Sequence, residues 1–200
     1  MTAAGRSGSA VKRRNKMSRV PQITRDKLQG DALKAWDSQK KNNNLTNMKE
    51  VLLQDYPTYD AFMAWYTSWN RLVQVVGVTD ATFYAHAIST TNSCMLCSLF
   101  FISDIRELGL DPENLELNER QQVLVELGQQ IVKDPTAVSD ELFDRLRKFF
   151  TDPEIVAVVG FGAQMIATNN FNSVLQINID DRLLPIKDQF KPATWRNSSK

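Results

Sequence analysis

Two cysteines separated by two residues, Cys94 and Cys97, are the side chains whose chemistry stands out in this sequence. Residues three apart on an α-helix share a face, so the two sulfurs could form a disulfide with little backbone movement. A thiolate can attack an oxidant and become a sulfenic acid, which the second thiol converts to a disulfide as water leaves. A zinc site would need about two more Cys or His ligands, and the chain has only His86 to offer. The spacing therefore favours a redox pair that needs no metal or cofactor, with two ordinary buried cysteines as the alternative.

The start of a helix is the place where such a pair gains reactivity. The dipeptide Asn92-Ser93 interrupts the apolar pattern, which predicts a new helix that begins at Ser93 as its N-cap and ends at Gly109. Backbone N–H groups at a helix start lower the pKa of a nearby thiol. On this argument alone, Cys94 is the more exposed and more strongly activated sulfur.

The elements around the pair are all predicted to be helices. Apolar residues recur at helical spacing, and the alternation typical of strands is nearly absent. The most apolar segment, from Ile155 to about Phe171, is expected to run through the middle of a compact bundle. The other predicted helices are a short one that starts at Thr24 or Asp26, then 47–53, 57–76, 80–91, 117–132 and one beginning at 139.

The chain divides into four predicted segments: a disordered basic tail (1–16), an N-terminal arm with a helix (17–44), a helical domain (45–178) and a C-terminal tail (179–200). The first 16 residues carry five basic side chains and no acidic one, whereas residues 17–200 carry 19 basic and 23 acidic side chains. A slightly acidic body argues against a nucleic-acid partner. The longest apolar stretch, 155–167, is shorter than the roughly 20 residues that span a bilayer, so we expect a cytoplasmic protein without membrane contact.

The segment Thr82 to Leu110, with Ala-Ile-Ser-Thr-Thr-Asn-Ser-Cys-Met-Leu-Cys before a helix that ends at Gly109, resembles the alkylhydroperoxidase D-like and carboxymuconolactone decarboxylase superfamily. The resemblance implies an all-α bundle that forms a dimer, trimer or hexamer. In the peroxidase branch it implies reduction of hydroperoxides by the two cysteines, which a dithiol protein or small thiol then regenerates. By position it makes Cys97 the attacking residue and Cys94 the resolving one. The similarity covers roughly residues 20–178 and continues in 117–120, 134–140, 152–156 and 169–175.

The proton relay of that peroxidase branch is missing here. The pattern has a His four residues after the second cysteine and a Glu twelve before the first, and this chain has Phe101 and Thr82 there. Neither side chain can act as a general base. His86, one helical turn after Thr82, is the one residue that could replace the relay, which completes a candidate catalytic set of Cys97, Cys94 and His86. It could equally be a buried histidine satisfied by a backbone carbonyl or a subunit contact.

Two further clusters have a structural and a functional interpretation. Five aromatic residues could line a hydroperoxide pocket, but helical spacing favours an ordinary core for them. Three asparagines near the end of the longest apolar segment could bind a ligand or join subunits, and capping of that helix is the favoured interpretation. The aromatic residues are Tyr56, Tyr59, Trp65, Trp69 and Tyr84, and the asparagines are Asn169, Asn170 and Asn172.

Three functions remain open from the sequence. The favoured one is a thiol-dependent oxidoreductase that reduces hydroperoxides and serves as an antioxidant enzyme. The second is an oligomeric protein that kept the fold and lost the chemistry. The third is a lyase of the carboxymuconolactone decarboxylase type, and Phe100 and Phe101 count against it because that branch uses histidines near these positions.

Overall fold

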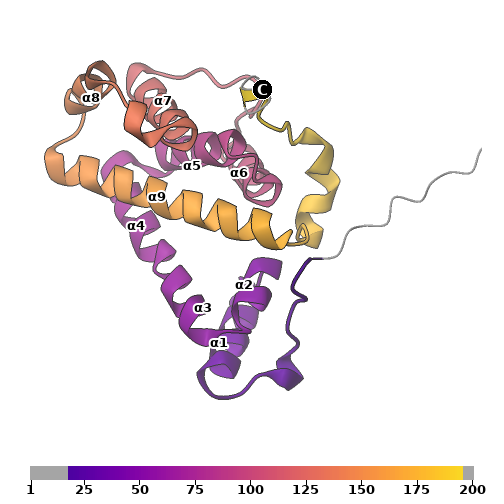
Figure 1. The fold of residues 1–200 in the computed structure, drawn as a ribbon. Helices are drawn as coiled ribbons and strands as arrows, with labels where there is room; N and C mark the ends of the chain where they lie inside the picture. The colour runs from indigo at the N-terminus through magenta and orange to yellow at the C-terminus, as the bar shows by residue number, and fades with distance from the viewer. Residues whose placement is uncertain (1–17, 196–200) are drawn as a thin grey trace, which may run out of the picture.

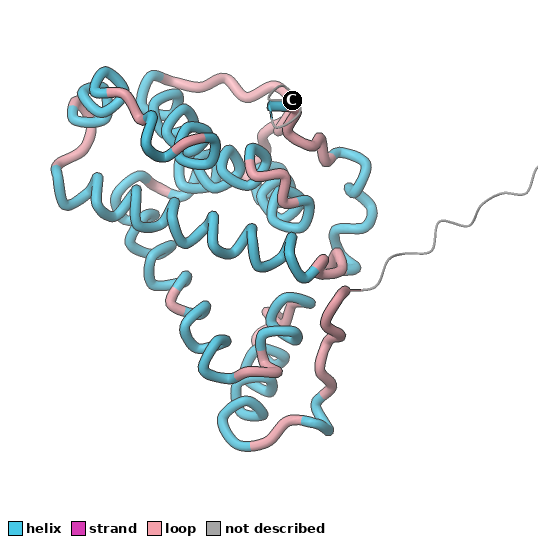
Figure 2. Tube along the Cα trace, in the orientation of Figure 1, coloured by secondary structure: helices cyan, strands magenta, loops and turns pink. Residues whose placement is uncertain are grey.

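The computed structural model describes residues 18–195, and every regular element in this part of the chain is a helix (Figure 2). The prediction of an all-α bundle is confirmed, while the predicted disorder of 1–16 lies outside the described residues. The α-helices are α1 (Gly30–Lys41), α2 (Asn47–Leu52), α3 (Tyr56–Met63), α4 (Trp65–Val76), α5 (Val78–Thr91), α6 (Met95–Glu107), α7 (Glu119–Lys133), α8 (Asp140–Arg147) and α9 (Asp152–Leu175), and the 3₁₀ segments are η1 (Arg25–Lys27), η2 (Pro135–Ala137) and η3 (Asp181–Gln189).

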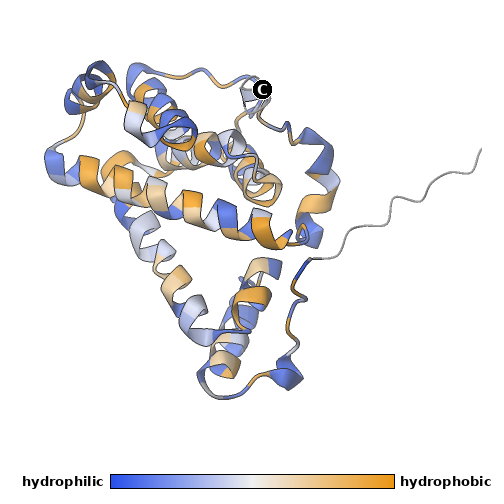
Figure 3. Cartoon of the chain, in the orientation of Figure 1, coloured by the Kyte–Doolittle hydropathy of each residue, from blue (hydrophilic) through white to orange (hydrophobic). Residues whose placement is uncertain are grey.

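The long helix α9 crosses the face of the bundle that Figure 1 shows and packs against α4 and α5. Thr151 and Glu154 form a reciprocal capping box at its start, which explains why the helix begins before the apolar run. It continues to Leu175, past the predicted end at Phe171, and stops where Gln176 adopts a left-handed conformation. Figure 3 shows apolar residues over much of α9 and polar residues over most of α8.

Helix α5 is the centre of the core, with ten of its 14 residues buried. It packs most closely with α7 and with α6. Tyr84 is fully buried and donates a hydrogen bond to the carbonyl of Val158, 3.2 Å away on α9. Gly128 and Gly162 make room for its ring, because a Cβ at either position would press on it. Thus α5, which leads into the cysteine pair, is held between α7 and α9.

The N-terminal arm differs from its prediction but carries a helix. The segment at Asp26 is only a 3₁₀ turn, and α1 begins at Gly30. A second, smaller core joins this arm to α2 and α3 through Leu28, Leu52, Leu53 and Tyr59.

Lys49 on α2 ties the arm to the rest of the molecule and is only 2% exposed. Its ammonium donates hydrogen bonds to Gln39 Oε1 at 2.9 Å and to the carbonyl of Asn44 at 2.7 Å. It also lies 4.9 Å from the centre of the Tyr66 ring. The buried charge is therefore satisfied by groups from the arm, the linker and α4.

The chain after α9 folds back over α6. Leu183 of η3 is buried in the main core, which places η3 against the middle of α6. Further on, the backbone N–H of Ala193 donates to Ser93 Oγ at 3.0 Å, and Trp195 Nε1 donates to the carbonyl of Thr91 at 2.8 Å. The described part of the tail thus contacts the turn that precedes the cysteines. Within residues 18–195 we find no helix whose length and apolar character would let it cross a bilayer.

Candidate functional site

Cys94 is itself the N-cap of α6, which corrects the predicted helix start at Ser93. Ser93 adopts a left-handed conformation with φ of 58°, and the chain enters the helix one residue later. The Cys94 sulfur accepts the backbone N–H of Cys97 at 3.3 Å, the bond that a Ser or Asp side chain usually provides at this position. A sulfur at the N-cap faces the positive end of the helix dipole, which favours a thiolate.

The two sulfurs lie 2.6 Å apart, in direct contact. The hydrogen bond between them lowers the pKa of Cys94, with help from the backbone N–H of Cys97 and the Ser173 side chain, although burial opposes this. Burial raises the pKa of Cys97 well above its usual value, and the neighbouring Cys94 sulfur adds to the rise. The pair therefore holds one proton more readily on Cys97 than on Cys94.

Asn172 contacts the Cys97 sulfur, and its place in the sequence did not reveal this contact. Its Nδ2 donates to the Cys97 sulfur at 3.2 Å. The favoured interpretation of the asparagines as helix caps is wrong, because α9 runs beyond them to Leu175. Asn169 instead accepts a hydrogen bond from Ser89, and Asn170 accepts one from Asn92. These contacts hold α9 against the turn that carries the cysteines.

A cavity of about 970 Å³ is lined by Cys97 and not by Cys94. Both cysteines are buried, with exposed fractions of 5% for Cys97 and 1% for Cys94, so the greater exposure expected for the Cys94 sulfur stays a prediction. The cavity volume lies at the upper end of what small-molecule sites have.

Aromatic side chains form much of the cavity wall. Trp65 and Trp69 stack with ring centres 5.4 Å apart, and Trp69 lies 6.2 Å from Phe101. Of the five aromatics singled out from the sequence, Trp65 and Trp69 line the cavity, whereas Tyr59 and Tyr84 are buried in the cores. The full aromatic lining is Phe62, Trp65, Tyr66, Trp69, Phe100 and Phe101.

The positions of the missing relay are filled by groups that have other roles. Thr82 donates its hydroxyl to the carbonyl of Val78 at 2.8 Å, and Phe101 is buried beside Trp69. His86 is largely buried, and its Nε2 has no hydrogen-bond partner among the described residues. Burial lowers the pKa of His86 to about 4. Within residues 18–195, no hydrogen bond joins His86 to either sulfur, so its role as a base stays a prediction.

Asp104 is a second residue that sequence reasoning missed. It lies seven residues after Cys97 on α6, close to two full turns, and it lines the same cavity. The pKa of its carboxyl group is raised to about 6, mainly by burial and also by the Glu107 carboxylate, while Arg182 opposes the shift. The spacing from Cys97 was a visible signal, but nothing in the sequence showed that this face of α6 borders a cavity.

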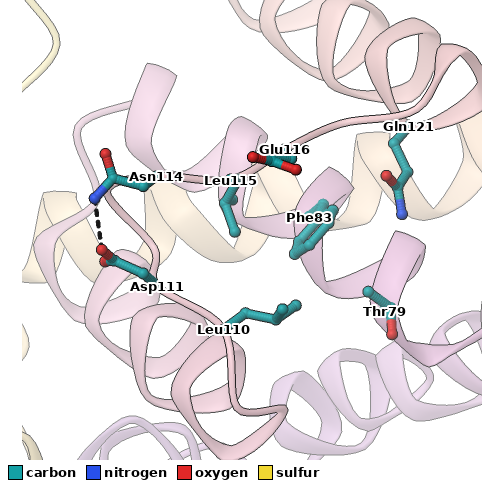
Figure 4. Close-up of a pocket in the computed structure, with 8 residues that line it drawn as sticks. All are labelled: Thr79, Phe83, Leu110, Asp111, Asn114, Leu115, Glu116 and Gln121. Carbon is teal, nitrogen blue, oxygen red and sulfur yellow. Dashed lines mark hydrogen bonds between the residues drawn. The ribbon is translucent and has the colours of Figure 1, made fainter.

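A second, smaller hollow of about 470 Å³ lies between α5 and the loop that joins α6 to α7 (Figure 4). Two of its polar lining groups are hydrogen-bonded to other side chains: Asp111 accepts from Asn114 at 2.6 Å, and Gln121 donates to Asp80 at 2.8 Å. It contains no cysteine. Its lining is Thr79, Phe83, Leu110, Asp111, Asn114, Leu115, Glu116 and Gln121. Within residues 18–195, no group of three or more His, Cys, Asp or Glu side chains is placed to hold a metal ion.

Solved structures share this architecture at low sequence identity. A peroxidase-related protein from Silicibacter sp. TM1040 matches with a TM-score of 0.70 and 16% identity, over 87% of this chain and 97% of that one. A peroxidase-related protein from Ralstonia eutropha JMP134, described as an alkylhydroperoxidase AhpD core, matches with a TM-score of 0.66 and 17% identity, over 89% of this chain and 100% of that one. The fold is that of the alkylhydroperoxidase D-like proteins.

The alkylhydroperoxidase D-like fold also occurs in the debrominase Bmp8, which matches with a TM-score of 0.71 and 14% identity, over 86% of this chain and 97% of that one. A cysteine-to-alanine variant of Bmp8 has been crystallised with 2,3,4-tribromopyrrole. No family profile and no curated protein sequence matches this chain. At these identities the comparisons establish the fold, and the chemistry rests on the residues of this chain.

Proposed function

We propose that this protein reduces organic hydroperoxides with the Cys94–Cys97 pair. The observation that carries the proposal is that Cys97 lines the large cavity while its sulfur contacts the Cys94 sulfur, 2.6 Å away. Cys97 can thus react with a substrate in the cavity, and Cys94 is close enough to form a disulfide with the oxidised Cys97. The peroxidase-related proteins of the same fold support this assignment.

The first step needs a thiolate on Cys97. Cys94 ionises more readily, so we assign it the role of base: the proton of Cys97 passes to the Cys94 thiolate across the sulfur–sulfur contact. The N–H of Asn172 then stabilises the charge on Cys97. This pairing replaces the Glu and His that the peroxidase pattern would provide. The proton transfer is uphill because burial favours the protonated form of Cys97, which predicts slow chemistry.

The Cys97 thiolate attacks the terminal oxygen of the hydroperoxide, the O–O bond breaks, and the alkoxide takes a proton to leave as the alcohol. Cys97 is then a sulfenic acid. Cys94 returns its proton to water, its thiolate attacks the Cys97 sulfur, and water leaves as the disulfide forms. In sum, two thiols and one hydroperoxide give a disulfide, an alcohol and water. A dithiol protein or a small dithiol, as the proposed partner, reduces the disulfide again by exchange.

Reductive debromination is a second candidate, favoured by the stacked Trp65 and Trp69 beside Cys97. Bmp8 shares the fold, and its cysteine variant was crystallised with a brominated pyrrole, a flat aromatic molecule of the kind that such walls accommodate. The balanced reaction converts an aryl bromide and two thiols to the unsubstituted ring, a disulfide, bromide and a proton. Both candidates use the same pair and the same cavity.

The deciding experiment counts free thiols in the reduced protein within seconds of adding one equivalent of cumene hydroperoxide. We expect the loss of two thiols per chain and the release of one cumyl alcohol. Cys97→Ser should keep its remaining thiol. Cys94→Ser, which lacks both the base and the resolving thiol, should form a Cys97 sulfenic acid more slowly than the wild-type protein reacts, and dimedone should trap it. Two thiols that stay free for hours would contradict the peroxidase assignment. Bromide release from 2,3,4-tribromopyrrole under the same conditions would then support the second candidate.

A further inference from the structure

Asp104 lines the same cavity as Cys97, seven residues further along α6. Seven residues of α-helix correspond to about 10 Å of rise, and both side chains lean toward the helix start, so their reactive atoms are separated by a similar distance. The carboxylate therefore cannot take a proton directly from Cys97. It can, however, contact the remote end of a molecule whose other end lies at the sulfur.

The Asp104 carboxylate has no hydrogen bond within the described part of the chain, although its neighbours shift its pKa. Asp180, another carboxylate of the same cavity, instead accepts the backbone N–H of Asn47 at 2.9 Å. The Arg182 guanidinium does not pair with Asp104 within 4 Å, since it lies 4.5 Å above the ring centre of Phe100. A half-buried carboxylate without a donor is a poor arrangement for stability and a good one for a ligand that brings a donor.

Aromatic rings fill the interval between the two ends. Phe100 and Phe101 lie on α6 between Cys97 and Asp104, and Trp65 and Trp69 face them from α4. A ligand that reaches from the sulfur to the carboxylate must therefore have a flat or apolar body about 7–10 Å long.

The charge around the cavity decides which end group fits. Four carboxylates and three cations line it, and two of the cations are already engaged: Lys49 by oxygen acceptors and Arg182 by Phe100. The excess of negative charge disfavours a carboxylate end group and favours a cation or a neutral donor. The groups are Glu50, Asp104, Asp180 and Asp181 on the acidic side, and Lys40, Lys49 and Arg182 on the basic side.

We propose that Asp104 is a specificity-determining residue that selects hydroperoxides with an apolar aromatic body and a cationic or hydrogen-bond-donating end opposite the peroxide. The inference rests on the proposed function for the reaction, but the binding preference belongs to the cavity and can be measured without any reaction. The peroxide group lies at Cys97 and the donor end at Asp104.

The test uses two unreactive alcohols of equal size, cumyl alcohol carrying a para aminomethyl group and cumyl alcohol carrying a para carboxyl group. Their binding to the reduced full-length chain at pH 7.5 is followed by tryptophan fluorescence, because Trp65 and Trp69 line the cavity. We expect the amine to bind about tenfold more tightly than the acid, as one half-buried charge contact would give. Equal affinities would overturn the proposal.

Asp104→Asn keeps the shape of the side chain and removes its charge, and it should reduce the tenfold preference to about twofold. Asp181→Asn is the matched control, since it removes an exposed carboxylate from the rim of the same cavity and should leave most of the preference intact. An Asp104→Asn protein that keeps the preference in full would refute the assignment. The reaction of the wild-type protein with cumene hydroperoxide, which has no polar end group, separates the two claims. Failure of that reaction alone would count against the proposed function and not against this inference.

The preference should also fade as the pH falls through about 6. Asp104 gains a proton there and loses its attraction for the amine. The titratable groups that act on it are Glu107 from its own helix and Arg182 from η3, and the other charged groups that line the cavity are Lys40, Lys49, Glu50, Asp180 and Asp181. A preference that stays constant from pH 5 to pH 8 in the wild-type protein would show that a different group selects the amine.

Discussion

The two hollows of this molecule differ in how their polar groups are satisfied. Around the smaller one, Asp111 and Gln121 already bond to neighbours in the chain. Around the larger one, Asp104 has no hydrogen-bond donor among the described residues, and the Cys97 sulfur contacts only the Cys94 sulfur and Asn172 Nδ2 there. The comparison shows that volume alone does not mark a site. Unmatched polar atoms within an apolar wall separate a binding cavity from a gap between helices.

Asn172→Leu should produce the largest change, because it removes the side-chain N–H that stabilises a thiolate on Cys97. A hydrogen bond to a charged group is worth about 1.5–3 kcal/mol, so thiol oxidation should slow by about 10- to 100-fold. The rate of reaction with cumene hydroperoxide from pH 6 to pH 10 measures the effect. Asn170→Leu serves as the control because Asn170 bonds to Asn92 and not to a sulfur. Equal rates in the wild-type protein, Asn172→Leu and Asn170→Leu would mean that Asn172 does not stabilise the attacking thiolate.

His86 should affect acid stability more than rate. Its pKa is lowered from 6.5 to about 4, so the unfolded chain binds a proton more readily than the folded one, and stability is lost as the pH falls from about 6.5 toward 4. The loss attributable to this residue is about 1–3 kcal/mol. Urea unfolding at pH 7.5 and pH 4.5 tests this, and in His86→Gln the difference between the two should shrink.

The same His86→Gln protein also tests the relay suggested by the sequence. With a pKa of about 4, His86 is a weak base, and we expect the variant to react with hydroperoxide within about threefold of the wild-type rate. A loss of tenfold or more at pH 7.5 would instead establish His86 as the base and displace Cys94 from that role.

Asp111→Asn should change least, and it sharpens the contrast between the hollows. The amide can replace one of the hydrogen bonds that the carboxylate makes to Glu113 and Asn114, in an exposed loop. Stability should change by about 0.5 kcal/mol or less, and thiol oxidation should stay the same. A clear change in the rate of thiol oxidation would mean that the small hollow is energetically coupled to the cysteines.

Local signals in the sequence predicted most of the fold. The helices expected over 117–132 and from residue 139 begin where Asn118 and Ser139 cap them, and Gly109, the expected end of the cysteine helix, adopts a positive φ. Each of these features depends on a few neighbouring residues, which a single sequence displays. One prediction that was wrong also had a local cause, since the left-handed conformation of Ser93 places the start of α6 one residue later than expected.

The cavity could not be predicted in the same way because it forms between segments far apart in the chain. Asn172 reaches Cys97 from 75 residues away, and Arg182 lies over Phe100 across a similar separation. Helical spacing placed Asp104 on the face of Cys97, but only the packing of α4, α9 and η3 shows that this face borders open space. The cysteine pair was visible from spacing, whereas its surroundings required the tertiary structure.

The buried ammonium of Lys49 connects the N-terminal arm to the large cavity. Two of its acceptors, the side chain of Gln39 and the carbonyl of Asn44, belong to residues that precede the main bundle, and the lysine itself borders the space that reaches Cys97. A shortened chain that starts at residue 45 would leave this cation without oxygen partners. The arm and the cavity are therefore thermodynamically linked, and a ligand that binds in the cavity should protect α1 from proteolysis.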